Sequence, residues 1–342
     1  IEHVARVARE PDGAGYVPSP GLPRLRETLA DDLSRSYGSP VNAGQLVITA
    51  GCNQAFCLVV QALAAPGDEV IEVLPYYFNY DMWLRMNGVV PRYLEPGPGL
   101  VPDPAAAQAL ITPRTRAIVL VSPGNPSGVT IAPDVLAAFF EVARRHDIAL
   151  ILDETYRSFR GTAEPAHELL ADPDWARTLV SLHSFSKDLA IPGYRVGAVL
   201  ASAELNREVM KLLDCVAICA PRVGQEAAWA GLSSAREWRR ARADEVLDRQ
   251  RGLEQAMAGQ PGGFELLTCG GFFGWIRHPL AGIGTDAVAR SLVTRYDTLV
   301  LSGTAFLPDD RQMLRVSFGN LDRTGLAEFA RRLELMAADA AA

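Results

Sequence analysis

Short apolar runs alternate with segments of helical periodicity from about residue 45 onward, and this alternation limits the folds open to the chain. The apolar runs are 45–49, 69–74, 116–122, 148–153, 178–184 and 195–201. The helical segments between the first four runs are 53–65, 77–87 and 133–146. Strands that alternate with helices usually pair in parallel, and helices then cover both faces of the sheet. The pattern therefore predicts an α/β fold whose large domain is a mostly parallel sheet covered by helices.

The pattern changes after about residue 204, where a helical stretch rich in Ala, Arg and Glu continues to residue 257. A few short apolar runs follow, at 264–267, 271–277 and 313–318. This change predicts a second, smaller α+β domain. We expect three parts, which are an N-terminal segment (1–40) that packs with the small domain, a large domain (41–220) and the small domain (221–342).

Length and composition exclude several classes of protein. The chain has 342 residues, enough for two domains of roughly 150 residues each. With 49% apolar and 21% charged residues it resembles soluble proteins, and its apolar stretches fall far short of the ~18 residues of a membrane span. The net charge of −7 and the scattered arginines disfavour binding to nucleic acid. We therefore expect small-molecule partners, and neither nucleic acid nor membrane.

The five cysteines are odd in number and lie in apolar surroundings. They show neither a CxxC pair nor the Cys/His spacing of a zinc site, so we expect reduced thiols and no bound metal. No signal or transit peptide is recognisable, although the printed chain begins at Ile1. These observations together predict a cytoplasmic protein.

Lysine is rare in this chain. Of the 33 basic residues, only Lys187 and Lys211 are lysines. A lysine can lose its proton and act as an amine nucleophile, which an arginine cannot do at working pH. Lys211 lies in a polar helical segment and is predicted to be a surface charge. Lys187 follows two serines, Ser184 and Ser186, and precedes Arg195. We therefore predict that it is an imine-forming amine.

Polar residues follow four of the predicted strands. In sheets of this kind, ligands bind at the carboxyl ends of the strands. The residues at those positions are Gly51, Cys52, Asn53, Asn125, Asp153, Ser184 and Lys187.

Most of these residues also have a purely structural interpretation. Asp153 either caps the following turn or is a buried carboxylate that pairs with a cation, such as a pyridinium nitrogen. Asn125 is either a turn residue between two prolines or a ligand-binding amide. The segment 51–53 enters a helix and can offer free N–H groups to a phosphate. Ser184 and Arg195 suit a phosphate too, or belong to a loop held by a salt bridge.

Seven segments together resemble a known enzyme family. They are YVPSPGLPRLRETLA, TAGCNQAF, LPYYFNY, SPGNPSG, DETY, SFSKDLAIPGYRVG and LRVSFGN, and they extend from residue 16 to residue 320 in family order. The chain resembles the pyridoxal-phosphate-dependent aminotransferases of class I/II, the aspartate aminotransferase superfamily, which have fold type I. The most specific part of the resemblance is SxxK with an Arg eight residues after the Lys, preceded by NPxG and DxxY.

The resemblance implies roles around the cofactor, pyridoxal 5′-phosphate. Lys187 would hold the cofactor through an imine and then move the proton between substrate and cofactor. Asp153 would pair with the ring nitrogen and keep it protonated. Asn125 and Tyr156 would hydrogen-bond the phenolic oxygen, and Tyr77 would stack on the ring.

The same resemblance implies how phosphate and substrate are held. The phosphate ligands would be Gly51, Cys52, Asn53, Ser184, Arg195 and, reaching from the partner subunit, Tyr16. This implies a homodimer with shared active sites. Arg315 and Asn125 would bind the substrate, with Arg315 gripping the α-carboxylate in a fork-like pair. Members of the family that are specific for dicarboxylates use an additional basic residue to bind the substrate side chain. The candidates for that residue here are Arg222 and Arg85.

We therefore predict a transferase of amino acid metabolism and biosynthesis that moves an amino group between a 2-amino acid and a 2-oxo acid. The same lysine-linked cofactor also supports β-elimination, decarboxylation or oxidation, so a lyase or oxidase acting on an amino acid is the alternative. A non-catalytic cofactor-binding regulator is a third interpretation. Regulators of this fold usually carry a DNA-binding module, and no basic helix-turn-helix segment is visible in the sequence.

Overall fold

Seven strands form one large sheet in the order β1-β7-β6-β5-β4-β2-β3 in this computed structural model, which describes residues 2–341. The strands are β1 Leu46–Thr49, β2 Glu69–Val73, β3 Val90–Leu94, β4 Thr115–Val121, β5 Ala149–Asp153, β6 Leu179–Ser184 and β7 Gly197–Leu200. Strands β2 to β6 pair in parallel, whereas β7 is antiparallel to both β1 and β6. The predicted mostly parallel sheet is confirmed.

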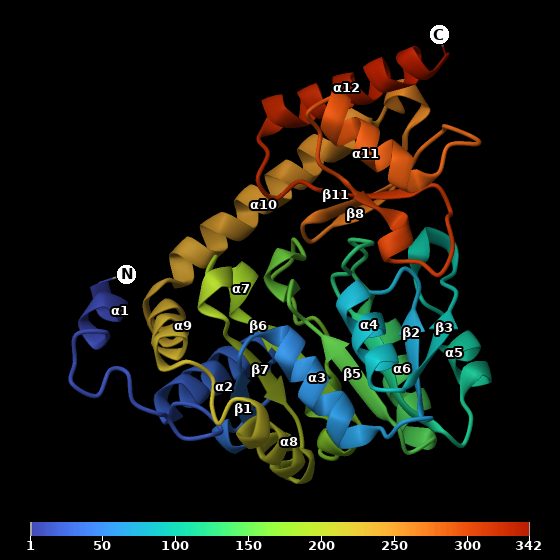
Figure 1. Cartoon of the computed structure of the whole chain (residues 1–342). Helices are drawn as coiled ribbons and strands as arrows, with labels where there is room; N and C mark the ends of the chain where they lie inside the picture. Colours follow the sequence, from blue (N-terminus) through green and yellow to red (C-terminus); the bar gives the residue numbers. More distant parts are fainter. Residues whose placement is uncertain (1, 342) are drawn as a thin grey trace.

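Helices cover both faces of this sheet (Figure 1). They are α2 Pro23–Tyr37, α3 Cys52–Leu63, α4 Phe78–Met86, α5 Pro104–Leu110, α6 Pro133–Arg145 and α8 Ala203–Val216. Because side chains alternate along a strand, Leu150 and Leu152 of β5 belong to the core on the α2 and α6 side. Ile151 between them belongs to the core on the α3, α4 and α8 side. Each central strand is therefore buried on both faces.

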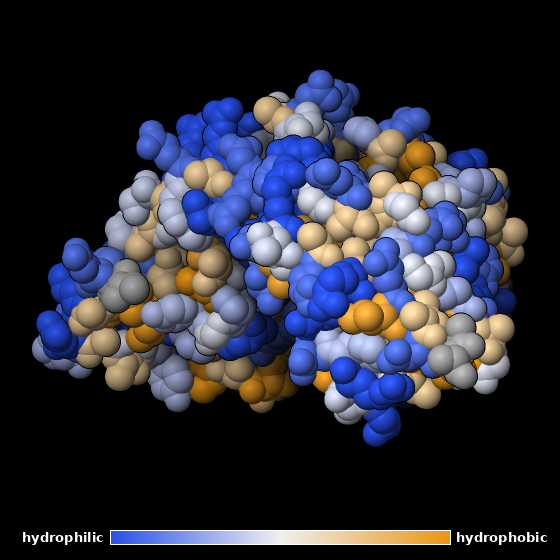
Figure 2. Space-filling view, turned by 90° about the horizontal axis from the view of Figure 1, so that it is seen from above, coloured by the Kyte–Doolittle hydropathy of each residue, from blue (hydrophilic) through white to orange (hydrophobic). Residues whose placement is uncertain are grey.

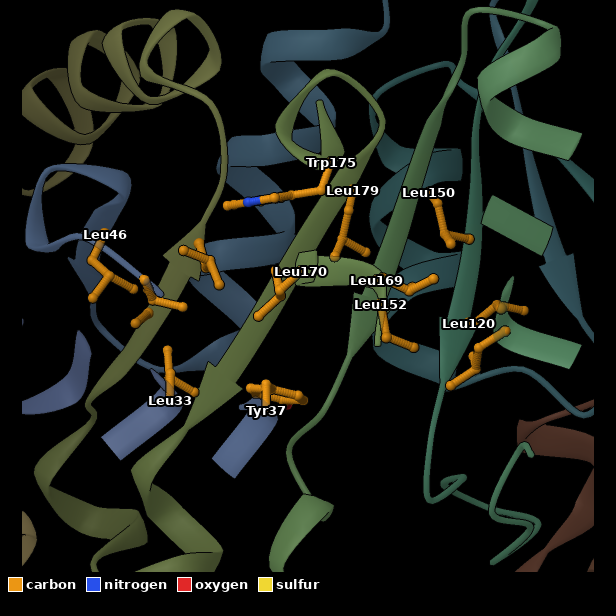
Figure 3. Packing of buried hydrophobic residues seen from close by; sticks show 14 of the residues in the cluster. Leu33, Tyr37, Leu46, Leu120, Leu150, Leu152, Leu169, Leu170, Trp175 and Leu179 are labelled. Carbon is orange, nitrogen blue, oxygen red and sulfur yellow. The ribbon is translucent and has the colours of Figure 1, made fainter. Parts of the chain in front are cut away.

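Helix α2 lies against the large sheet, so the expected packing of the N-terminal segment with the small domain is wrong for this helix. Its buried residues recur every four positions and form one apolar stripe, made of Leu25, Leu29, Leu33 and Tyr37. This stripe joins the core that includes Leu46 and Ile48 of β1. Figure 3 shows Leu33 and Tyr37 of α2 among the leucines of the sheet.

The helical stretch expected to end at 257 is three separate helices, α8, α9 Arg222–Ser234 and α10 Arg236–Met257. Pro221 directly precedes α9, which contacts α2 and the short N-terminal helix α1 Glu2–Val7. Ala228 and Leu232 of α9 belong to the large-domain core. The division at 220 and 221 stays a prediction, and this packing favours a boundary after Ser234.

The small domain is built on a second sheet, antiparallel, in the order β10-β11-β9-β8. Its elements are β8 Glu265–Gly270, β9 Phe273–Arg277, α11 Thr285–Arg295, β10 Leu301–Ser302, β11 Met313–Ser317 and α12 Arg323–Ala341. Helix α10 runs from the large domain to this part and packs on β8 and α12 (Figure 1). The predicted α+β small domain is thus present.

The length of the helices, the hydropathy of the surface and the state of the cysteines describe how the chain faces its surroundings. Within residues 2–341, no helix combines the length and the apolar character needed to cross a bilayer. Hydrophobic residues form small groups among hydrophilic ones on the face shown in Figure 2. None of the five cysteines forms a disulfide.

Candidate active site

A pocket of about 390 Å³ lies between the two domains, at the carboxyl ends of the central strands. The large domain contributes Cys52, Asn53, Tyr77, Phe78, Asn125, Asp153, Thr155, Tyr156, Ser184, Ser186, Lys187, Pro192 and Arg195. The small domain contributes Phe272, Phe273, Arg315 and Ser317. Most of the predicted site residues, from segments far apart in sequence, therefore meet in one place.

Asp153 is the last residue of β5, and its carboxylate is buried, with 4% exposed. Its Oδ2 accepts a hydrogen bond from Tyr80 Oη at 2.8 Å, and its Oδ1 accepts one from the Thr155 backbone N–H at 2.9 Å. Cys52 Sγ also donates to Oδ1, at 3.5 Å. Burial raises the pKa of Asp153, although these donors oppose the rise. None of these three donors carries a positive charge, so they leave the charge of the carboxylate, which lines the pocket, unneutralised.

Lys187 lies in α7 (Phe185–Asp188), a single helical turn that begins directly after β6. Ser184 caps this turn, since its Oγ accepts a hydrogen bond from the Ser186 N–H at 3.2 Å. Burial, together with the positive charges of Arg315 and Arg195, lowers the pKa of Lys187. A lowered pKa increases the fraction of neutral amine, which is the nucleophilic form.

Arg315 enters the pocket from β11 of the small domain. Its Nη1 donates a hydrogen bond to Asn125 Oδ1 at 2.8 Å, and its guanidinium lies over the rings of Phe273 and Phe306 at 4.6 and 4.9 Å. Its Nε is buried and finds no hydrogen-bond partner within residues 2–341. A desolvated guanidinium with an unused donor is suited to bind a carboxylate.

Gly51 and Arg195 form a cradle at the N-terminus of α3. Gly51 has a φ of +91°, and a Cβ at this position would lie 2.3 Å from Arg195 Nη2. Only glycine therefore lets the guanidinium approach the first turn of α3, although Gly51 itself does not line the pocket. The N-terminal N–H groups of a helix and an arginine together attract an anion such as phosphate.

The two tyrosines expected beside the cofactor ring both line the pocket. Tyr77 precedes α4, and its Oη accepts a hydrogen bond from Asn79 Nδ2 at 2.9 Å. Tyr156 follows β5 and is buried, and its ring meets that of Phe273 edge to face at 5.4 Å. Burial raises the pKa of Tyr156, and the nearby Asp153 raises it further. Burial and then Asp153 also raise the pKa of Tyr77, so both rings lie near the buried carboxylate.

Besides Gly51, three predicted residues lie outside the pocket. Tyr16 is 80% exposed. Arg222 donates to the carbonyl of Asp12, and Arg85 is bound to Asp81, so neither candidate for the extra basic residue lines the pocket.

Sequence reasoning did not find Tyr80, which binds Asp153, nor the aromatic pair Phe272 and Phe273. Tyr80 lies three residues after Tyr77, and residues three apart share one face of a helix. This spacing is the signal that could have identified Tyr80. Phe272 lies in the turn between β8 and β9 and Phe273 begins β9, and no local pattern connects them with β5.

Comparison with known proteins agrees with this geometry. The family model for aminotransferase class I and II matches residues 1–333. The chain belongs to the class I and II aminotransferases. It is therefore an enzyme that transfers amino groups with pyridoxal phosphate, as predicted, and the lyase and oxidase alternatives find no support in the comparisons.

Several relatives of this aminotransferase are similar over most of their length. A probable aspartate/prephenate aminotransferase of Thermus aquaticus is 31% identical over 330 residues, covering 90% of this chain and 79% of the relative. The arginine–pyruvate transaminase AruH of Pseudomonas aeruginosa is 33% identical over 326 residues, covering 95% and 82%. A tetra mutant of Thermus thermophilus aspartate aminotransferase superimposes with a TM-score of 0.87 at 28% identity, covering 98% and 92% of the two chains. These matches confirm the fold type I architecture.

The pocket of this aminotransferase suits the chemistry of pyridoxal phosphate. A buried carboxylate without a charged donor (Asp153), an amine of lowered pKa (Lys187) and a cradle that only glycine permits (Gly51) surround one space. These three groups match a pyridinium nitrogen, an aldehyde and a phosphate, respectively.

Proposed function

We propose that Lys187 binds the cofactor covalently and moves the proton at the substrate Cα, that Asp153 holds the proton on the ring nitrogen, and that Arg315 binds the substrate α-carboxylate. The observation that carries this proposal is their convergence: an amine of lowered pKa, a buried carboxylate and a partly unpaired guanidinium face one pocket. When bound, pyridoxal phosphate supplies a ring that withdraws electrons from the substrate Cα. The chain supplies the base, the counter-ion and the clamp.

The other lining residues orient these groups. Asn125 holds the Arg315 guanidinium through its Oδ1. Its amide group and the Tyr156 hydroxyl would hydrogen-bond the phenolic oxygen of the cofactor, and Tyr77 would stack on the ring. Cys52, Asn53, Ser184 and Arg195, beside Gly51, would bind the phosphate at the helix terminus.

The substrates are a 2-amino acid and a 2-oxo acid, and the lining favours donors with uncharged side chains. Phe78, Phe272 and Phe273 present aromatic surface. Within residues 2–341, the lysine and arginines that line the pocket are Lys187, Arg195 and Arg315, all of which have a role already.

A panel of amino acids added to purified protein without a 2-oxo acid tests the proposed function. A transaminase completes half a reaction, so the visible absorbance of the bound cofactor is lost while the matching 2-oxo acid appears in equal amount. We expect aromatic and aliphatic donors to react faster than aspartate. Release of ammonia together with the oxo acid would instead identify a lyase or an oxidase.

Arg315→Lys is expected to weaken binding of every amino acid in the panel, because an ammonium keeps the charge but loses the two-pronged geometry. The KM for the donor should rise about tenfold, the equivalent of ~1.4 kcal/mol, whatever the side chain. Arg277→Lys in the neighbouring strand β9 is the matched control, since Arg277 is exposed and pairs with Glu265. An effect confined to acidic donors would place Arg315 at the substrate side chain instead.

We further propose a cytoplasmic homodimer that acts in amino acid metabolism and biosynthesis. The exposed position of Tyr16 supports shared active sites, because an 80% exposed phenol outside its own pocket is free to contact a second copy. The free cysteines support a reducing compartment.

Tyr16→Phe is expected to weaken cofactor binding by about 1.5–3 kcal/mol, the range for a hydrogen bond to a charged group. The measurement is the dissociation constant of pyridoxal phosphate for reconstituted protein. Tyr296→Phe is the control, because that hydroxyl binds Asp339 in the small domain. Mixing inactive Lys187→Ala with a severely impaired Tyr16 variant should restore part of the activity, since one site of each heterodimer then has neither defect. An active monomer in light scattering would contradict the shared site.

A further inference from the structure

Three residues of the proposed active site are each followed directly by a charged residue. The pairs are Asp153-Glu154, Tyr156-Arg157 and Lys187-Asp188. Glu154 and Asp188 are 2% and 9% exposed, and the Arg157 side chain is 15% exposed. Charged groups are rarely buried in this way unless they are paired. Their partners therefore show what holds these three segments in place.

Two of the three charged neighbours join one ion cluster, formed by Asp32, Arg157, Arg239 and Asp188. Arg157 Nη2 lies 2.7 Å from Asp32 Oδ2, and Arg239 Nη1 lies 3.0 Å from Asp32 Oδ1. Arg239 Nη2 lies 2.6 Å from Asp188 Oδ2. Asp32 lies on α2 and Arg239 lies on α10. Through these residues the two helices contact Arg157, which follows Tyr156, and Asp188, which follows Lys187.

The electrostatics of the ion cluster are balanced. Two carboxylates face two guanidinium groups, so these four charges sum to zero, and the exposed Arg35 adds only a longer contact of 3.8 Å to Asp32 Oδ1. Burial alone would raise the pKa of Asp32, but Arg157 and Arg239 outweigh burial and hold that pKa well below its usual range. Removing one member would leave a buried charge without its partner, which costs more than the loss of an exposed ion pair.

Helix α2 also reaches the third charged neighbour. Tyr37 of α2 donates its hydroxyl to Glu154 Oε1, and Ser181 donates to Glu154 Oε2. Thus two residues of α2, Asp32 and Tyr37, contact the residues that follow Tyr156 and Asp153. Through Arg239, Asp32 is also linked to the residue that follows Lys187.

We propose that Arg239 is a positioning residue, which acts through Asp188 to fix the direction of Lys187 relative to Asp153. Helix α7 is a single turn, so its own hydrogen bonds give it little rigidity. The pair Arg239–Asp188 ties this turn to α10, and the pair Arg239–Asp32 ties it to α2. A side chain displaced by about 1 Å from its reactive geometry can lose about 100-fold in rate. The inference rests on the proposed role of Lys187.

The test measures how fast Lys187 becomes linked to added pyridoxal phosphate. Cofactor-free protein is mixed with pyridoxal phosphate, reduced with borohydride at intervals, and the modified Lys187 peptide is quantified by mass spectrometry. For Arg239→Gln we expect linkage at least about tenfold slower, and kcat about 10- to 100-fold lower with KM within about threefold. Arg239→Lys should recover part of the linkage rate, since an ammonium can pair with Asp188 but cannot bridge both carboxylates equally.

Arg24→Gln is the matched control. Arg24 lies on α2 and pairs with the buried carboxylate of Glu226 on α9, away from the three charged neighbours. This variant should lower the thermal midpoint but keep the linkage rate within about twofold of the wild type. If Arg239→Gln links at the wild-type rate, or if Arg24→Gln slows linkage equally, the ion cluster only stabilises the fold and the inference is wrong.

Asp188→Asn keeps the test decisive if Arg239→Gln fails to fold. It removes one charge while leaving an amide oxygen that can accept from Arg239, so we expect linkage about three- to tenfold slower. An unchanged rate in this variant would overturn the inference. Failure of the proposed function gives a different result, because the wild-type protein itself would then bind cofactor without modification of Lys187.

Discussion

Lys187→Ala is expected to abolish turnover while the protein stays folded and retains much of its affinity for the cofactor. The proposed phosphate cradle and ring contacts remain in these variants, but the amine proposed to link the cofactor and move the proton is absent. Lys187→Arg should be equally inactive, because a guanidinium cannot lose its proton at working pH. Steady-state transamination and cofactor titration measure the two effects separately.

Lys211→Ala provides a control that matches this change closely, since the chain has only these two lysines. Lys211 is exposed on α8 and pairs with Glu208 one turn earlier. An exposed ion pair of this kind contributes little stability, so the variant should behave like the wild type. General acid–base catalysis alone is worth roughly 10²–10⁴ in rate. More than about one hundredth of the wild-type rate in either Lys187 variant would contradict its role.

The large sheet was predictable because its central strands are buried on both faces, which gives continuous apolar runs such as 148–153. Strand β3 was missed for a related reason. It is an edge strand, and Val90 to Leu94 includes a proline and an arginine, which weaken the apolar signal. An edge strand is recognised by its pairing with β2, and that pairing is not visible locally.

The position of α2 could not be derived from its own sequence. The stripe from Leu25 to Tyr37 shows that one face of the helix is buried, but not against which domain. Its polar contacts are also distant in sequence, because Asp32 meets Arg157 and Arg239, which lie 125 and 207 residues away. Contacts of that range leave no periodic signal.

The pocket shows the same division between local and long-range information. Residues that follow strands, such as Asp153 and Lys187, were found because the ends of parallel strands meet at one edge. Phe273 was not found, since it reaches the pocket only after the small domain folds over the large one. Neither candidate for the extra basic residue, which would bind an acidic substrate side chain, lines the pocket. Arg85 instead pairs with Asp81 one helical turn away.

Asp153→Asn is expected to lower kcat and kcat/KM together, by about 10²–10³, which is the range for loss of one preorganised electrostatic contact. The carboxylate is buried and receives only uncharged donors from Tyr80, Thr155 and Cys52. A protonated ring nitrogen would supply the missing cation and favour the ionised acid. An amide cannot hold that proton, so the ring withdraws electrons less strongly and loss of the proton from the substrate Cα slows. The solvent exchange rate of that proton measures the step directly.

Asp103→Asn is the control that separates this role from simple capping. Asp103 accepts a hydrogen bond from the N–H two residues later at 2.9 Å, as Asp153 does, but it caps α5 far from the pocket. Since asparagine caps helices nearly as well as aspartate, this variant should keep both its stability and its kcat. If Asp153→Asn also keeps its kcat and only KM rises, Asp153 is a structural cap. Because charge is the main difference between the two acids and their amides, a fall in kcat confined to Asp153→Asn assigns the effect to the charge facing the cofactor nitrogen.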